Sequence, residues 1–222
     1  MPRPLVNELA RIAAALAIGA WQACATASPQ LAFDEVFDTR DAPRWLHYRV
    51  EYRDAAGPHR LEVWRDAGRQ LKRVTDERIE TYAVALENDM RLAIVDRQRG
   101  TLTVADRATL MRLGLFVDPF GQAHGVARPM GAYALEATGR TEEVSGRRCT
   151  VWRLTPAPSS APSDVCWDRT AGVPLVIRDA EGVDQWRVIA LDEAAIDEAL
   201  FAPPKAGLAV NDLNRELAPD AD

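Results

Sequence analysis

Lysine is almost absent from this sequence. It occurs only at Lys72 and Lys205, so nearly all of the 27 basic residues are arginine. The formal net charge is -6 and the sequence pI is about 5.2, and no basic cluster with interleaved aromatic residues interrupts this acidic balance. Because nucleic-acid-binding domains present a basic face, the composition argues against a nucleic acid as the partner.

Catalytic motifs are absent as well. The three histidines, His47, His59 and His124, are scattered and form no pair at the helical spacing of a metal site. Ser145 does not lie in a Gly-x-Ser-x-Gly motif, and the glycine-containing stretch 121–131 lacks the lysine of a phosphate-binding loop. We therefore expect a protein that is not an enzyme and has no catalytic residues, metal or cofactor. An enzyme is kept as a third hypothesis.

The apolar run at residues 12–20 is too short to cross a bilayer as a helix. Arg3 and Arg11 precede this run. The sequence Ala25-Thr26-Ala27 follows it and has the small residues of a signal-peptide cleavage site. This pattern predicts a cleaved signal peptide at 1–27 and a periplasmic protein whose membrane contact is peripheral or absent. The alternative is an uncleaved or amphipathic N-terminal helix.

Only three cysteines are present. Cys24 follows the apolar run and is either lost with the signal peptide or used as a lipid-attachment site. The residues before it, Trp-Gln-Ala at 21–23, are a poor context for lipid attachment. Either outcome leaves Cys149 and Cys166 in the exported domain, an even number that is consistent with one disulfide bond.

Cys149 and Cys166 lie in two β-favouring segments, residues 146–152 and 165–168, which flank a turn-rich connector centred near Pro158. In an antiparallel hairpin about this centre, facing positions have numbers that sum to about 315, and the two cysteines satisfy that sum. We therefore predict a disulfide-closed hairpin, with a stabilisation of roughly 3 kcal/mol from the bridge. The alternative is a pair of buried free thiols.

Period-two alternation is the main structural signal after residue 44. Leu46, Tyr48, Val50 and Tyr52 alternate with polar residues, as in a half-buried strand. Short strands follow one another through short polar turns that leave no room for a crossover helix, which predicts an antiparallel meander. The expected strands lie near residues 44–52, 60–66, 70–75, 78–86, 90–96, 101–105, 133–138, 142–144, 146–152, 165–168, 173–178 and 184–191.

Helical signals are few. Phe33, Val36 and Phe37 have near-helical spacing in the opening segment 28–42. Asp106 is suited to cap a helix that extends to residue 114, after which a proline breaks the apolar stretch 115–120. A helical turn at 196–201 ends the element pattern. The predicted organisation is one domain at 28–207 and a mobile C-terminal tail at 208–222.

The C-terminal half has a distinct pattern of short motifs. These are Gly-Arg-Arg-Cys-Thr-Val-Trp at 146–152, Cys-Trp-Asp at 166–168, Gly-Val-Pro-Leu at 172–175 and Phe-Ala-Pro-Pro-Lys-Ala-Gly at 201–207. With the meander and the helical segment 106–120, the pattern resembles the exported branch of the LolA-like superfamily, whose members are periplasmic lipoprotein-carrier-like proteins. The resemblance implies a mainly β (α+β) fold, in which a strongly curved antiparallel sheet forms an incomplete barrel and short helices plug its concave side.

An open, curved sheet leaves an apolar concavity that helices or a ligand must fill. Leu110, Leu113, Phe116, Phe120 and Met130 are suited to line or cap it, and we interpret them as ligand-binding residues of a flap at 106–131. The alternative interpretation is that they are core residues under a helix.

Three tryptophans are a second candidate surface. Trp45, Trp64 and Trp186 alternate with the apolar residues of their strands, which predicts a position on the convex side, either under a helix or at a partner interface. The apolar residues used as the reference are Leu46, Leu61 and Val183.

Two functional hypotheses follow from these features. The first is a non-enzymatic exported binding or carrier protein that holds a lipid, an acyl chain, a lipidated protein or another apolar ligand in the concavity. The second is an envelope protein-interaction or sensor module that docks a protein partner on the same sheet.

Overall fold

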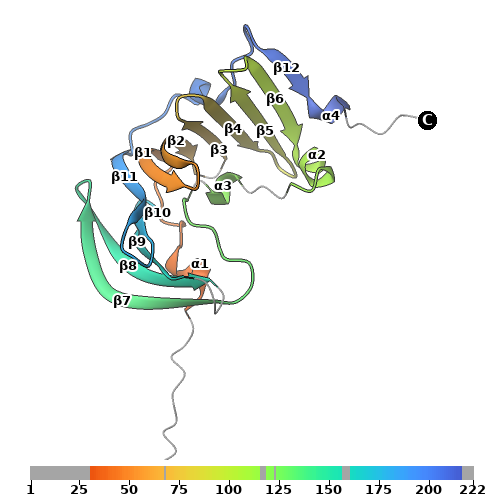
Figure 1. Cartoon of the computed structure of the whole chain (residues 1–222). Helices are drawn as coiled ribbons and strands as arrows, with labels where there is room; N and C mark the ends of the chain where they lie inside the picture. The colour runs from red at the N-terminus through yellow and green to blue at the C-terminus, as the bar shows by residue number, and fades with distance from the viewer. Residues whose placement is uncertain (1–30, 68, 116–118, 123, 157–160, 217–222) are drawn as a thin grey trace, which may run out of the picture. The chain divides into compact units, whose positions relative to one another are not determined.

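One curved, open sheet of twelve strands makes up most of the described part of the chain in the computed structural model (Figure 1). The strand order is β12-β6-β5-β4-β3-β2-β1-β11-β10-β9-β8-β7. Every neighbouring pair is antiparallel except β12 and β6. The predicted fold class, a mainly β protein with a curved antiparallel sheet that stops short of a closed barrel, is confirmed.

The strands have the following bounds: β1 (Trp45–Asp54), β2 (Gly57–Asp66), β3 (Gln70–Thr75), β4 (Ile79–Ala85), β5 (Met90–Asp96), β6 (Thr101–Asp106), β7 (Tyr133–Val144), β8 (Arg147–Pro156), β9 (Ser163–Asp168), β10 (Val173–Arg178), β11 (Asp184–Asp192) and β12 (Ala209–Asp212). The two predicted strands at 133–138 and 142–144 are one long strand, β7, whose register shifts between Ala137 and Thr141.

The structure describes residues 31–67, 69–115, 119–122, 124–156 and 161–216. The predicted signal peptide, Cys24 and Phe116 lie outside these residues. No helix among the residues described is both long and apolar enough to span a membrane.

The alternation that predicts β1 places its apolar side chains on one buried face. Tyr48 lies opposite Val63 of β2, and Val50 lies opposite Leu61. All four are at most 2% exposed. They belong to the main core cluster, which extends from Ala105 in β6 to Val144 in β7. The pairing of β1 with β11 therefore joins the first meander, β1 to β6, to the second meander, β7 to β11.

Two short helices cover the main core. Leu110 of α2 (Arg107–Arg112) is part of it, and Phe120 of α3 (Pro119–Gln122) packs against it. The predicted cap is confirmed, because the Asp106 carboxylate accepts a hydrogen bond of 2.7 Å from the Thr109 N–H. The predicted proline break is instead the first residue of α3, since proline fits the first turn of a helix, where its missing N–H is not needed.

The predicted opening helix is present as α1 (Phe33–Val36). Together with Phe37, it forms a second core with residues of β7, β8 and β9. The Phe37 ring meets Trp167 edge-on at 5.3 Å, and the Tyr133 hydroxyl accepts a hydrogen bond of 2.9 Å from the Phe33 N–H. These contacts attach the N-terminal arm to the second meander.

The mobile tail predicted from residue 208 is wrong in its described part. Ala209–Asp212 form β12 and pair in parallel with β6, and α4 (Leu213–Glu216) follows. The Asn214 side chain also accepts a hydrogen bond of 2.8 Å from the Asp106 N–H. The sequence contains no signal for β12 because main-chain pairing at an exposed edge needs no apolar alternation.

The predicted alternation of the tryptophans with the apolar residues of their strands is confirmed for two of the three, and the convex position stays a prediction. Trp45 and Trp64 lie opposite the main core, and Trp45 stacks at 6.4 Å on Phe201 of the 3-10 helix η1 (Glu198–Phe201). Trp186 instead packs against the main core. It shares a face of β11 with buried Val188, whereas Val183, the residue used as the reference, lies in the turn before the strand and is 50% exposed.

Candidate functional site

The structure brings two of the five predicted ligand-binding residues to the same core. Leu110 is 5% exposed, and Phe120 packs against the main core that contains it. Leu113 at the end of α2 is 43% exposed, and Met130 is fully exposed. Phe116 lies outside the described residues. A ligand-binding role for these residues stays a prediction.

A buried arginine contacts His124, a residue of the segment 106–131. Arg65 of β2 is only 4% exposed. Its Nη1 donates a hydrogen bond of 2.6 Å to Nδ1 of His124, and its Nη2 donates one of 2.5 Å to the Ala171 carbonyl. We name these residues, with Gly172, the Arg65 cluster. It ties the segment after α3 to the turn between β9 and β10.

The electrostatics of the cluster are unusual for a buried cation. No carboxylate among the described residues forms an ion pair with Arg65, and its buried Nε–H has no hydrogen-bond partner. Burial lowers the pKa of the Arg65 guanidinium, which the nearby Tyr48 hydroxyl partly opposes. Burial raises the pKa of Tyr48 itself to about 12. Burying a charge without an ion-pair partner costs free energy, so packing alone does not account for the position of Arg65.

Two groups compete for the Nδ1 atom of His124. Its Nδ1 accepts from Arg65 and also lies 3.0 Å from the Gly172 carbonyl oxygen. The same nitrogen cannot accept from one group and donate to the other at once. The bond from Arg65 therefore requires a lone pair on Nδ1, which only a neutral imidazole with its proton on Nε2 provides.

Two glycines allow the segment around His124 to lie close to the sheet. Both have a positive φ, +72° at Gly125 and +64° at Gly172. A Cβ atom at Gly125 would lie 2.9 Å from Pro174 Cγ and 3.0 Å from Trp186 Cζ2. Any larger residue would push this segment away from β10 and β11.

Arg65 was not among the predicted site residues, although the sequence contains a signal for it. The alternation that places Leu61 and Val63 of β2 on the core face also places Arg65 there. A basic residue on the buried face of a strand is a candidate functional residue when no acid forms an ion pair with it.

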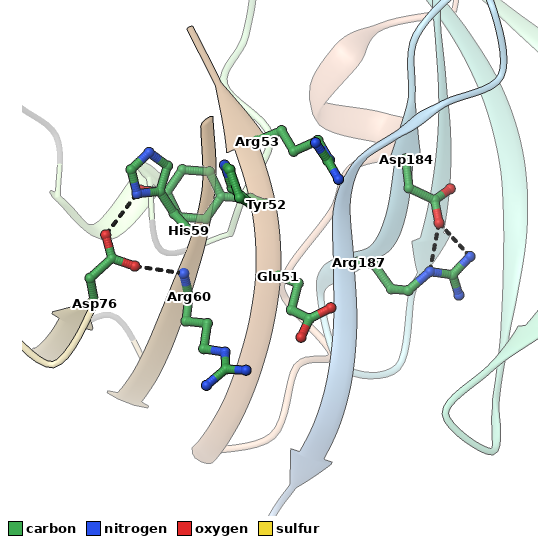
Figure 2. Close-up of a pocket in the computed structure, with 9 residues that line it drawn as sticks. Glu51, Tyr52, Arg53, His59, Arg60, Asp76, Asp184 and Arg187 are labelled. Atoms are coloured by element: carbon green, nitrogen blue, oxygen red, sulfur yellow. Dashed lines mark hydrogen bonds and ion pairs between the residues drawn. The ribbon is translucent and has the colours of Figure 1, made fainter. Parts of the chain in front are cut away.

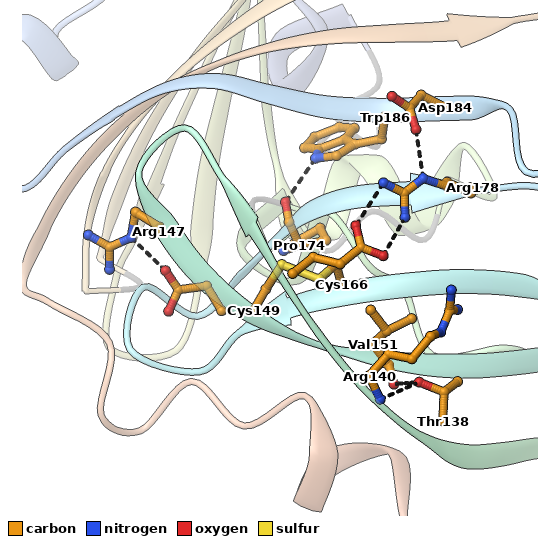
Figure 3. Close-up of a disulfide and its surroundings, with 12 residues drawn as sticks. Thr138, Arg140, Arg147, Cys149, Val151, Cys166, Pro174, Arg178, Asp184 and Trp186 are labelled. Carbon is orange, nitrogen blue, oxygen red and sulfur yellow. Dashed lines mark hydrogen bonds and ion pairs between the residues drawn. A yellow bond between two sulfur atoms is a disulfide. The ribbon is translucent and has the colours of Figure 1, made fainter.

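The predicted disulfide between Cys149 and Cys166 is confirmed (Figure 3). The two cysteines lie on the neighbouring strands β8 and β9 and are at most 2% exposed. Figure 3 also shows Arg178 and Trp186 on β10 and β11 near the bridge. The bond is part of the main core and is not a reactive surface group.

The other two histidines pair with carboxylates. His47 Nε2 lies 2.7 Å from Glu62 Oε1, and His59 lies between Asp54 and Asp76, at 3.0 and 2.7 Å. Within the described ranges, no group of three or more histidine, cysteine or acidic residues has the arrangement of a metal site.

No protein-family model and no curated protein matches this sequence. Among solved structures, the chain is similar to a crystal structure of MucB, to MucB in complex with MucA(peri), and to the MucA/MucB complex of Pseudomonas aeruginosa. In that order, the identities are 16%, 16% and 14%, and the TM-scores are 0.44, 0.44 and 0.43. The matches cover 80%, 78% and 77% of this chain but only 63%, 59% and 59% of the other chains. At these values the comparison describes a partial similarity and assigns neither a family nor a function.

Proposed function

We propose that this protein is an exported, non-enzymatic binding protein that holds an acyl chain or similar amphiphile beneath the segment 106–131. The observation that carries the proposal is Arg65, a buried guanidinium with one unpartnered N–H and no carboxylate partner in the part of the chain that the structure describes. An anionic head group at this position would neutralise the charge and use the free Nε–H. The attached chain would lie along the apolar main core.

The covering segment has the features that such a ligand needs. His124 reaches Arg65 through one competing hydrogen bond, which a ligand head group would replace. Met111, Leu113 and Leu115 are each more than 40% exposed on the same segment, so apolar side chains are available to contact a chain. This is the class of ligand that the LolA-like resemblance implies.

The proposed location is the periplasm. The buried Cys149–Cys166 bond supports an oxidising compartment, since disulfides are rare in proteins of the reducing cytosol. An envelope protein-interaction or sensor module stays the alternative function, and it does not exclude an apolar ligand, because a docked partner and a bound chain can use different faces of a sheet.

Binding of a dansyl-labelled fatty acid to the periplasmic protein tests the proposal. We expect Arg65→Met to weaken binding of the acid by roughly tenfold or more, because a charge-assisted hydrogen bond is lost. Binding of the corresponding methyl ester should be weak in both proteins. Arg91→Met, at an exposed position of β5, is the matched control and should bind like the wild type.

Three results would contradict the proposal: no binding of the acid, equal binding of acid and ester, or equal binding by the Arg65→Met variant. Circular dichroism must show that the variant is folded. Turnover of the ligand by the wild-type protein would contradict the non-enzymatic part of the proposal.

A further inference from the structure

Arg65 has a basic neighbour on the same face of the sheet. Leu71 of β3 lies opposite Arg65, and Arg73 lies two residues further along β3. Because side chains alternate along a strand, Leu71 and Arg73 project from one face. Diagonal neighbours of this kind lie about 7 to 8 Å apart, which is within the reach of long side chains. We name Arg65 and Arg73 the arginine pair.

Both members of the arginine pair act on the Tyr48 hydroxyl of β1. Val63 of β2 lies opposite Tyr48 on one side and opposite Arg73 on the other, so all three side chains share the core face. Tyr48 is 1% exposed, and burial raises the pKa of its hydroxyl. The charges of Arg65 and Arg73 partly oppose this rise. A single buried hydroxyl is therefore within the electrostatic range of both guanidinium groups.

Two acids lie nearby in the register, and both have basic partners. Asp96 of β5 lies two strands away from β3, and its carboxylate forms ion pairs of 3.6 and 3.7 Å with Arg78 and Arg99. Asp76, in the turn after β3, lies 2.7 Å from a ring nitrogen of His59 (Figure 2). These two carboxylates are thus already used by other basic groups.

The core face changes from covered to open at the arginine pair. In line with Arg73 across the sheet, Thr81 and Thr103 are half-buried and Ile94 is 36% exposed. The residues in line with Arg65 are at most 6% exposed, and they are Leu46, Leu71, Ala83, Leu92 and Ala105. The pair therefore lies at the border between the apolar core and solvent, where an amphiphile places its head group.

We propose that the ligand carries a head group with two negative charges, which Arg65 and Arg73 bind together. This ligand class rests on the proposed function, because the head group takes the place of His124 on Arg65 and extends to the second cation. A carboxylate would neutralise only one guanidinium. A phosphate monoester carries a charge of about -1.5 to -2 at pH 7 and three acceptor oxygens, which guanidinium groups bind through paired hydrogen bonds. A phosphate monoester on an alkyl or acyl chain has the required chemistry.

Isothermal titration calorimetry of the purified protein with decyl phosphate and decyl sulfate tests the proposal. The two probes share the chain and the tetrahedral head group, but at about pH 8 the sulfate carries one negative charge and the phosphate about two. We expect decyl phosphate to bind at least about tenfold more tightly. Inorganic phosphate at the same concentration should not compete, because it lacks the chain that packs on the core.

Three variants assign the second charge to Arg73. Arg73→Met should reduce the preference for phosphate over sulfate to about twofold or less, whereas Arg73→Lys keeps a positive charge and should retain the preference to within about threefold. Lys72→Met is the matched control, since it removes a charge from the next residue of β3. The Lys72 amine lies 5.1 Å from the centre of the Trp64 ring on the opposite face, so this variant should keep the wild-type preference. Circular dichroism checks that each variant is folded.

The proposal is overturned if the wild type binds decyl phosphate and decyl sulfate equally, a comparison that needs no variant. It is also overturned if inorganic phosphate competes as well as decyl phosphate, or if Arg73→Met and Lys72→Met reduce the preference equally. Failure of the proposed function has a different result, namely that the dansyl fatty acid does not bind or that Arg65→Met binds it normally. A protein that binds the fatty acid but does not distinguish phosphate from sulfate would retain the proposed function without the doubly charged head group.

Discussion

The guanidinium of Arg178 on β10 donates two hydrogen bonds, of 2.9 and 2.8 Å, to the carboxylate of Glu142 on β7. The strands β8 and β9 lie between β7 and β10 in the sheet order. A direct contact across two intervening strands is possible only where the sheet curls strongly. The pair therefore fixes the curvature of the second meander, and the Glu142 bonds raise the pKa of Arg178.

The first prediction is that Glu142→Gln destabilises the protein by about 1 to 3 kcal/mol, because bidentate, charge-assisted bonds between mostly buried groups are lost. Urea unfolding followed by tryptophan fluorescence measures the change. Glu143→Gln is the control, since this neighbour is exposed and should change the free energy of unfolding by less than about 0.5 kcal/mol. Equal effects of the two substitutions would show that the Arg178–Glu142 pair does not stabilise the curvature of the sheet.

The second prediction concerns the bridge between Cys149 and Cys166, which are 17 residues apart. Replacing both cysteines by alanine should remove roughly 3 kcal/mol and lower Tm by several degrees, because the unfolded chain regains the freedom of a closed loop. Affinity for the dansyl fatty acid should change little, since Arg65 is on β2, which pairs with neither β8 nor β9. An unchanged Tm, with the oxidised state of the wild type verified by mass spectrometry, would contradict this role.

The third prediction separates backbone strain from close packing at Gly125. Gly125→Ala and Gly146→Ala both place a side chain at a positive φ, +72° and +76°. Only Gly125 has neighbours within 3.0 Å of the new Cβ. We expect Gly146→Ala to destabilise by about 1 kcal/mol and Gly125→Ala by at least about 1 kcal/mol more. Similar Tm values for the two variants would show that the segment around His124 moves away freely.

The fourth prediction is a pH dependence of stability from His59. Hydrogen bonds to Asp76 first and Asp54 second raise the pKa of His59 above its ordinary value of 6.5. The stabilisation is therefore complete below the unfolded-state value and is lost as pH rises through the raised pKa. The Tm advantage of the wild type over His59→Gln should shrink between about pH 5.5 and 8.5.

Asp76→Asn is the companion variant for this pH series. It removes the larger of the two causes, so the pH-dependent part of the stability should become smaller. The pKa values of Asp54 and Asp76 are themselves lowered, and these carboxylates stay charged throughout the measured range. A wild-type advantage that stays constant or grows with pH would contradict the assignment to His59.

Local patterns were sufficient to predict most elements of the fold. The alternation of apolar and polar residues predicts the burial of Leu46, Tyr48 and Val50. The capping side chain of Asp106 predicts the start of α2. The Cys149–Cys166 pairing follows from hairpin symmetry alone. Each of these signals depends on residues close in sequence or on one turn, which is why the sequence contains enough information to predict them.

Features that depend on distant parts of the chain were missed. β12 pairs through its backbone with β6, and no pattern of side chains predicts such a contact. Trp186 was assigned to the wrong face because the reference residue, Val183, is outside the strand. The unusual character of Arg65 depends on the three-dimensional surroundings of its side chain, where no acid among the described residues forms an ion pair with it.

The sheet order has a consequence for synthesis of the chain. The first meander has two open edges, at β1 and at β6, and both are filled by strands from the last part of the sequence, β11 and β12. While the ribosome makes the protein from its N-terminus, these edges stay unpaired until residues 184–212 have emerged. We expect nascent chains that stop before β11 to aggregate through these edges, which ribosome-release assays of truncated chains can measure. The two edges of the first meander thus depend on residues 184–212 for their pairing.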